Sequence, residues 1–393
     1  MSLILKRNKF LIVFLILLSV LCGVPVQAKN NKLDFKLKSE AAVLMDFNNG
    51  QLLYQKKAHK KLSPASITKI MTMLLVMEAL EDEKVKLSDT VVVSEHAAEM
   101  GGSQIWLEPG EEMKLEELLK AVAIVSANDA CVALAEYIYG TADQFIEQMN
   151  LKAKELGMKN TKFYNTNGLP SEESEMGNYT TAYDVALMTR ELLNYPNVLN
   201  YTSVWIDHLR AGDSFLRNTN KLVRFYDGAD GVKTGYTTEA GFCLSATAQR
   251  AGLRFISVIM KAPSSQVRFE ESKELLSSAF NIYRSLVVVN SGKIIGRTKV
   301  FKGQQKYVAA IPANKLTISI LKGDEDKLLK RTILQQEVTA PITKGDKLGE
   351  IVVVKNKKEI AKVNLIAKSN IKKASYRKII TNLFIEFVGN LMS

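Results

Sequence analysis

Ser66 and Lys69 are the first residues whose types and spacing could do chemistry. A helix is predicted to begin here, and residues three apart on a helix lie on one face, so the lysine amine can reach the serine hydroxyl. A serine is a weak nucleophile unless a base lies beside it. A lysine serves as that base only where burial or nearby positive charge lowers its pKa. The pair therefore indicates nucleophilic catalysis, although Ser369 and Lys372 share the same spacing.

Two further motifs lie downstream. Residues 126–128 read Ser-Ala-Asn and fall between two predicted helices, where Ser and Asn could equally cap the second helix. Residues 233–235 read Lys-Thr-Gly and open a predicted pair of strands. Considered alone, this motif is also typical of a strand that follows a turn. Neither motif is specific by itself.

The three motifs together are far more specific. They follow the order S-x-x-K, S-x-N and K-T-G, at intervals of 60 and 107 residues, which is the set known from penicillin-binding proteins and related β-lactamases. Residues 62–66, 165–170 and 230–235 extend the match (Leu-Ser-Pro-Ala-Ser, Asn-Thr-Asn-Gly-Leu-Pro and Asp-Gly-Val-Lys-Thr-Gly). From about Ala41 to its C-terminus, the chain resembles the low-molecular-mass penicillin-binding proteins that act as D-alanyl-D-alanine carboxypeptidases.

The resemblance implies a role for each matching residue. Ser66 would form an acyl-ester, and Lys69 would be the general base. Ser126 would pass a proton to the leaving D-alanine, and Asn128 would hold the substrate amide. The backbone N–H groups of Ser66 and Tyr236 would form the oxyanion hole. Some family members carry histidine at the position of Tyr236, so no side-chain role follows for this residue.

Substrate recognition is implied for four more residues. Lys233 and Thr234 would bind the terminal carboxylate region, and Gly235 would let the substrate backbone approach the strand. Arg268 matches a family arginine linked to carboxylate recognition. Its surroundings in the sequence are also those of a plain surface arginine.

The implied activity is removal of the terminal D-alanine from peptidoglycan stem pentapeptides, with β-lactam antibiotics as inhibitors that acylate the serine. One alternative is a β-lactamase-like hydrolase, whose fast deacylation uses the pattern Glu-x-x-Leu-Asn. Residues 191–194 (Glu-Leu-Leu-Asn) are one position short of it and lie at a predicted helix end. The other alternative is a catalytically silent wall-binding protein. The intact residues of the three motifs favour the enzyme.

The resemblance implies an α/β (α+β) domain of the serine transpeptidase and β-lactamase-like class, and the elements around the motifs fit it. A hairpin is expected at residues 41–54, strands at 242–248 and 253–260, and helices at 67–80, 115–125, 130–139, 142–156, 181–193 and 271–283. Strand pairs at both ends with helices between them indicate an antiparallel sheet with helices packed on it and a helical subdomain. The helix at 67–80 is apolar on nearly all sides, which is typical of a buried helix.

Four segments follow from these patterns. Residues 1–28 resemble a signal peptide, because a basic start and an apolar run precede Val26-Gln27-Ala28. Residues 29–283 form the catalytic domain, and residues 284–374 hold short β-rich runs separated by turns. Residues 375–393 contain an apolar stripe at helical spacing, which predicts an amphipathic membrane-surface helix. The alternatives are an uncleaved anchor at the N-terminus and a terminal helix docked on its own protein.

Charge and composition indicate which kinds of partner the protein can have. The net charge is +12, and residues 355–378 hold nine Lys or Arg and one acid, which suits an anionic membrane surface. We therefore expect an exported protein, peripheral on the outer face of the cytoplasmic membrane (periplasmic or extracellular side). A nucleic-acid partner is not expected, since no binding motif is found.

The three histidines lack the spacing of metal ligands, so no metal and no cofactor is expected. Cys131 and Cys243 read as buried thiols, and a disulfide between them stays open.

Overall fold

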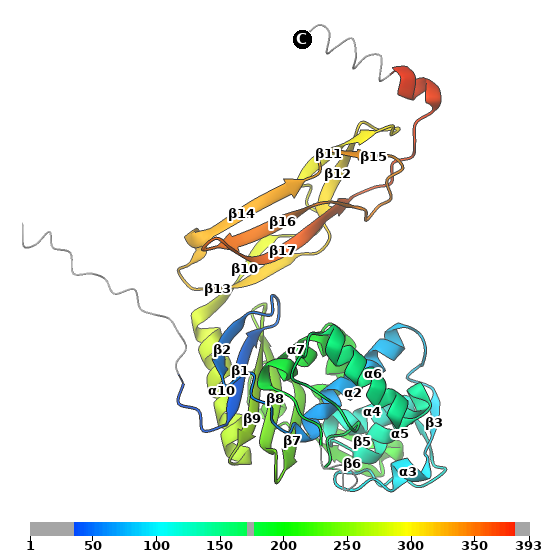
Figure 1. The fold of residues 1–393 in the computed structure, drawn as a ribbon, viewed down its shortest axis with the longest axis vertical. Coiled ribbons are helices and arrows are strands. Elements are labelled where there is room, and N and C mark those ends of the chain that lie inside the picture. Colours follow the sequence, from blue (N-terminus) through cyan, green and yellow to red (C-terminus); the bar gives the residue numbers. More distant parts are fainter. Residues whose placement is uncertain (1–34, 171–176, 382–393) are drawn as a thin grey trace, which may run out of the picture. The chain divides into compact units, whose positions relative to one another are not determined.

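A computed structural model describes residues 35–170 and 177–381 of the chain. An α/β domain carries the three motifs, and an all-β domain follows it in the sequence (Figure 1). The predicted fold class is confirmed. The predicted signal peptide, residues 1–28, and most of the predicted terminal helix, residues 376–392, lie outside the described residues.

A five-stranded antiparallel sheet forms the centre of the α/β domain, in the order β2-β1-β9-β8-β7. The strand bounds, in that order, are Leu52–Lys56, Ala41–Asp46, Leu253–Ala262, Gly241–Arg250 and Ala229–Thr237. All six residues of β1 are buried, because helices cover both faces of the sheet. Figure 1 shows α10 (Ser265–Ile282) on one face and the other helices on the opposite face. The sheet joins the two ends of the domain, as the sequence pattern predicts.

The central helix of the domain is α2 (Lys69–Glu81). Every residue from Lys69 to Met77 is buried, which explains why the helix is apolar on nearly all sides. Four helices pack around it: α4 (Leu115–Ile124), α5 (Asn128–Tyr139), α6 (Ala142–Glu155) and α7 (Ala182–Leu192). The short elements are η1 (Ala65–Thr68), α3 (Glu95–Ala98), η2 (Pro196–Val198), α8 (Leu199–Thr202), η3 (Arg210–Gly212) and α9 (Leu222–Phe225).

Two features of this domain differ from the sequence expectation. The last helix begins at Ser265 rather than near residue 271, because the Ser264 hydroxyl accepts a hydrogen bond from the Val267 amide and caps it there. Arg268 therefore lies in the first turn of α10. Two small hairpins also escaped prediction: β3 (Thr90–Val92) with β4 (Glu112–Lys114), and β5 (Ile206–Leu209) with β6 (Ser214–Arg217).

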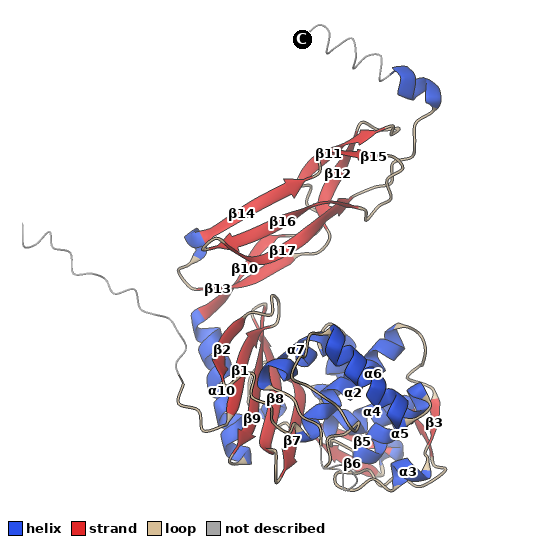
Figure 2. Ribbon diagram, in the orientation of Figure 1, coloured by secondary structure: helices blue, strands red, loops and turns tan. Residues whose placement is uncertain are grey.

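The all-β domain, drawn almost entirely as strands in Figure 2, contains two sheets. One pairs β10 (Tyr283–Val289) with β13 (Leu316–Leu321). The other has the order β14-β16-β17-β12-β11-β15, with bounds Leu328–Leu334, Lys347–Lys355, Lys358–Ala367, Tyr307–Pro312, Gly296–Phe301 and Glu337–Thr339. A single turn of 3-10 helix, η4 (Glu325–Lys327), precedes β14. A separate hydrophobic cluster, which includes Val308, Ile351 and Leu365, forms the core of this domain.

The two cysteines of the described chain are buried free thiols, so Cys131 and Cys243 do not form a disulfide in this structure. Within residues 35–170 and 177–381, no helix combines the length and the apolar composition needed to cross a membrane.

Candidate active site

Ser66 lies in η1, directly before α2. This turn places its side chain over the first turn of α2, and Ser66 Oγ is 3.2 Å from Lys69 Nζ. The neighbours of Ser66 in η1, Ala65 and Ile67, are fully buried, so the turn is anchored in the core. The predicted contact between hydroxyl and amine is therefore present.

The Lys69 side chain is fully buried and has three hydrogen-bond acceptors. These are Ser66 Oγ, Asn128 Oδ1 at 2.5 Å and the Asn167 backbone oxygen at 2.9 Å. Burial lowers the pKa of Lys69 to about 8, against weaker opposing effects from Cys131 and Asp129. About a tenth of the amine is then neutral at pH 7. That fraction can accept a proton from the serine.

The second motif meets the same amine through Asn128, the first residue of α5. Asn128 also donates its Nδ2–H to the Gly101 carbonyl at 2.7 Å, so the amide is held from two sides. Ser126 has a positive φ of 68° and does not cap α5. Among the described residues, the buried Ser126 hydroxyl has no hydrogen-bond partner. It is therefore available to a substrate.

The third motif lies within β7. The Lys233 side chain is buried, and its ammonium group donates to the Thr234 carbonyl at 3.1 Å. Burial lowers the pKa of Lys233 well below its usual value, and the positive charges of Lys69 and Arg268 lower it further. Thr234 Oγ1 donates to Thr219 Oγ1 at 2.7 Å.

Gly235 lets β7 approach the nucleophile. A Cβ at this position would lie 2.8 Å from the Pro64 carbonyl oxygen and 3.0 Å from the Ser66 amide nitrogen, closer than side chains normally come. The strand therefore runs directly beside the backbone N–H of Ser66. The Tyr236 ring is 55% exposed and stacks on Phe242 at 4.3 Å, so its side chain points away from this contact.

Arg268 is buried rather than a surface arginine. Its Nη1 donates to the carbonyl oxygens of Gly235 at 2.9 Å and Cys243 at 3.1 Å, which ties β7 to β8. Its guanidinium also lies 4.9 Å from the centre of the Phe269 ring. Burial lowers the pKa of Arg268 to about 10. The arginine thus lies behind the strand, and its charge adds to the field at Lys233.

The combined electrostatics favour an anion. Lys69, Lys233 and Arg268 are all buried, and none of them forms an ion pair with a described carboxylate. Desolvation without a counter-ion is unfavourable for each cation. A substrate carboxylate that enters the site would relieve that cost.

Sequence reasoning assigned no role to two residues that support the site. The Asn167 backbone oxygen is an acceptor for Lys69, a role that its residue type does not reveal. Thr219 orients the Thr234 hydroxyl and carried no signal in the sequence. Within the same segment, Gly168 has a φ of +86°, and an Asn-Gly pair was the available clue to a tight turn.

Comparison with known proteins decides the family. A family profile described as D-alanyl-D-alanine carboxypeptidase matches residues 26–264, which is more than half of the chain. The chain belongs to this family. A second profile, described as penicillin-binding protein 5, C-terminal domain, matches residues 283–373 and so covers the all-β domain. Family membership and the geometry of the three motifs therefore agree.

Several relatives are similar over most of the chain. D-alanyl-D-alanine carboxypeptidase DacF of Bacillus subtilis is 44% identical over 86% of this chain and 87% of its own length. The crystal structure of penicillin binding protein 5 from Haemophilus influenzae has a TM-score of 0.72 at 30% identity, with 87% of this chain and 99% of that chain covered. Penicillin-binding protein D2 of Listeria monocytogenes, solved in its ampicillin-bound form, has a TM-score of 0.58 at 31% identity, over 63% of this chain and 100% of its own.

Gly168 offers a stability test of the site's support. A Cβ at Gly168 would lie 1.9 Å from the Ala65 carbonyl oxygen, so Gly168→Ala must displace η1 or the segment 165–170. We expect the free energy of unfolding to fall by more than about 2 kcal/mol in urea denaturation. Gly157 is the control, because its φ is +72° but nothing lies within 4 Å of its Cβ position. Gly157→Ala should cost only about 1 kcal/mol. Equal losses would contradict the close approach.

Proposed function

We propose that the chain is a serine-type D-alanyl-D-alanine carboxypeptidase that removes the terminal D-alanine from peptidoglycan stem pentapeptides through an acyl-ester on Ser66. One observation carries the proposal. Ser66 Oγ lies 3.2 Å from a buried Lys69 amine whose pKa burial lowers to about 8. A nucleophile beside a partly neutral base is what acyl transfer requires.

Acylation begins when Ser66 Oγ attacks the carbonyl carbon of the penultimate D-alanine and gives its proton to Lys69 Nζ. The carbonyl oxygen becomes an oxyanion, which the backbone N–H groups of Ser66 and Tyr236 stabilise. The close approach of Gly235 to η1 supports this arrangement, because it brings β7 against the Ser66 amide.

The C–N bond then breaks, and the leaving amine of the terminal D-alanine takes a proton through Ser126. The Ser126 hydroxyl suits this relay because it is buried and lacks a partner among the described residues. Free D-alanine and the acyl-ester on Ser66 result. Water then attacks the ester with Lys69 as base, which releases the shortened peptide and restores Ser66.

Recognition of the free carboxylate rests on the buried positive charge. Lys233 and Thr234 on β7 bind the carboxylate, and Asn128 holds the amide of the penultimate residue. Arg268 acts from behind the strand, because its Nη1 is bonded to the Gly235 and Cys243 carbonyls. It positions β7 and contributes charge.

The alternatives gain no support from the geometry. β-lactams share the first step, since they also present an amide carbonyl to Ser66. Glu191, the residue that would correspond to a β-lactamase glutamate, accepts a hydrogen bond from Asn194 at 3.0 Å at the end of α7. A silent wall-binding protein would not need a lysine base held at hydrogen-bond distance from its serine.

Substitution of the nucleophile and the base tests the proposal. Ser66→Ala should abolish labelling by a fluorescent penicillin and release of D-alanine from a pentapeptide, because no attacking atom remains. Lys69→Arg should be nearly inactive, because arginine stays protonated. Ser369→Ala and Lys372→Arg are matched controls with the same spacing on the exposed surface of the all-β domain, and they should behave like the wild type. Substantial labelling of purified Ser66→Ala protein would overturn the assignment.

The pH dependence of acylation tests the base separately. Lys69 accepts a proton only in its neutral form, so the second-order rate of penicillin acylation should rise with pH and level off above about 8, where burial sets the pKa of Lys69. Stopped-flow measurements on the free enzyme report this value. A rate that falls through the neutral range would show that the protonated lysine is the active form, and a constant rate would show that no base titrates there.

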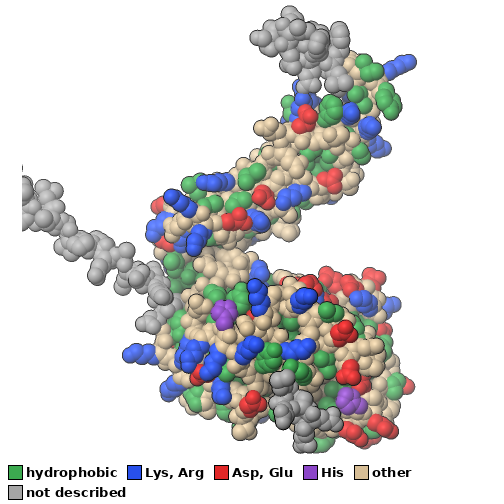
Figure 3. All heavy atoms as spheres, in the orientation of Figure 1, with side chains coloured by type: hydrophobic (Ala, Val, Ile, Leu, Met, Phe, Trp, Pro, Cys, Tyr) green, Lys and Arg blue, Asp and Glu red, His purple; other side chains and the backbone are tan. Residues whose placement is uncertain are grey.

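Export and membrane attachment form a second part of the proposal. Residues 1–28 have the layout of a cleavable signal, and residues 376–392 carry the apolar stripe of an interfacial helix. The described start of that segment, residues 376–381, is helical, with Tyr376 80% and Ile380 67% exposed. Residues 284–374 hold 20 Lys or Arg and 7 Asp or Glu, and Figure 3 displays many of these basic side chains on the visible face. Such charge favours an anionic membrane surface.

Removal of the terminal segment tests this attachment. A chain truncated after Lys373 should still be acylated by penicillin but should no longer sediment with anionic phospholipid vesicles, because the apolar stripe is lost. Neutral phosphatidylcholine vesicles provide the control for the electrostatic part. Full sedimentation of the truncated protein, or none of the full-length protein, would contradict the proposed anchor.

A further inference from the structure

Trp106 is a large apolar side chain that the fold holds out into solvent. It is 78% exposed, whereas its neighbours Ile105 and Leu107 are buried at 6% and 5%. Its φ is +58°, in the left-handed region that a bulky residue rarely adopts. A glycine or an asparagine would adopt this left-handed backbone conformation with less strain. Neither packing nor backbone preference therefore explains a tryptophan here.

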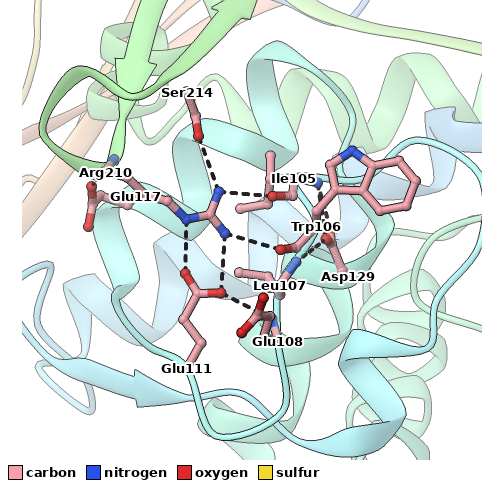
Figure 4. Close-up of polar contacts among 9 residues, drawn as sticks. All are labelled: Ile105, Trp106, Leu107, Glu108, Glu111, Glu117, Asp129, Arg210 and Ser214. Atoms are coloured by element: carbon pink, nitrogen blue, oxygen red, sulfur yellow. Dashed lines mark hydrogen bonds and ion pairs between the residues drawn. The ribbon is translucent and has the colours of Figure 1, made fainter.

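Two charged side chains fix the backbone on either side of Trp106 (Figure 4). The buried Asp129 carboxylate accepts hydrogen bonds from the amides of Ile105 and Leu107 at 3.0 and 3.2 Å. The Arg210 guanidinium donates to the Ile105 carbonyl at 2.9 Å and the Trp106 carbonyl at 3.3 Å. The indole is thus carried by a rigid backbone rather than by a loose loop.

The Arg210 side chain is itself held in place. Its Nε and Nη2 donate to the two oxygens of Glu111 at 3.0 and 3.2 Å, and Nη1 donates to Ser214 Oγ at 3.2 Å. The Arg210 amide donates to Glu117 at 3.3 Å. Figure 4 shows these groups converging on the guanidinium from separate segments of the chain. The negative charge of the Glu111 carboxylate is therefore compensated by Arg210, and that of Asp129 is compensated by backbone amides.

The same loop is connected to the active site. Asn128, which precedes Asp129, accepts a hydrogen bond from Lys69 and donates to the backbone carbonyls of Gly101 and Ser103 in the loop. The path of contacts from Ser66 through Lys69, Asn128 and Asp129 limits the distance from the nucleophile to the indole to at most roughly 25 Å. Four stem residues remain after the terminal D-alanine leaves, and they reach about 13 Å when extended. The glycan to which the stem is attached then lies within the range of distances open to Trp106.

We propose that Trp106 is a subsite for the saccharide portion of the peptidoglycan substrate, against whose C–H face the indole stacks. An aromatic face is electron-rich and large, so it packs well on such a surface. The two carboxylates that hold this loop, those of Asp129 and Glu111, are compensated by backbone amides and by Arg210. This inference rests on the proposed carboxypeptidase function. It adds a binding site for the saccharide portion of the substrate, beyond the stem peptide.

Fluorescence gives a direct test, because the chain contains only two tryptophans, Trp106 and Trp205. A Ser66→Ala, Trp205→Phe protein binds substrate without turnover and leaves Trp106 as the only indole. A purified disaccharide pentapeptide should change its emission in a saturable way, and the free pentapeptide should not. Equal responses to both ligands would assign Trp106 to the peptide. Calorimetric binding of the disaccharide pentapeptide without any change in emission would overturn the subsite.

Steady-state kinetics provide a second test of the proposed subsite. Trp106→Ala should raise KM for the disaccharide pentapeptide by about three- to tenfold, while kcat, KM for the free pentapeptide, penicillin acylation and Tm stay unchanged. Phe225→Ala is the matched control, because Phe225 is an equally apolar ring, 64% exposed, without a positive φ. An unchanged KM in Trp106→Ala would refute the proposal. Loss of penicillin labelling in every variant and in the wild type would instead refute the proposed function.

Discussion

The burial of two lysine ammonium groups in one site, without a carboxylate paired to either, is the constraint on which the active site depends. Lys69 and Lys233 have 0% and 1% of their side chains exposed, and in the described structure their hydrogen-bond acceptors are neutral oxygens. Such burial is unfavourable, and each positive charge makes the other less favourable. The same cost depresses the pKa of Lys69, which suits it to the proposed role of base, and it favours the binding of an anion. The burial of these lysines thus both supports the proposed catalysis and lowers the stability of the site.

The rest of the domain can be understood as the means of holding these groups together. The apolar surface of α2 allows a lysine to enter the core, and the N-terminus of α5 brings Asn128 to it. The segment 165–170 adds a backbone carbonyl from a third direction, and its left-handed glycine lets it lie against η1. Strand β7 comes from the other end of the domain. Because the supporting segments are far apart in sequence, the site forms only when the whole α/β domain is folded.

Much of the fold and of the site could be predicted from the sequence. The features that could not be predicted depend on contacts between distant segments or leave no pattern of residue types. The three motifs, the buried helix and the sheet built from both ends each leave a local pattern of residue types. The third acceptor of Lys69 is a main-chain oxygen, so the identity of Asn167 could not reveal it. The burial of Arg268 depends on rings and carbonyls of β8 and α10 that come together only in three dimensions. The two short hairpins leave no such pattern, because their strands have only three or four residues each and most of these are not buried.

The strand order has a consequence for how the chain acquires its structure. β1 lies inside the sheet, and its partner β9 pairs Ala41 with Met260, more than two hundred residues later. A chain that emerges N-terminus first therefore presents a strand that is apolar from Ala41 to Met45, with one hydrogen-bonding edge unfilled until β9 has been synthesised. Closure of so long a loop is slow, since contacts between distant residues lower the folding rate. During that interval the unfilled edge of β1 is open to pairing with a foreign strand.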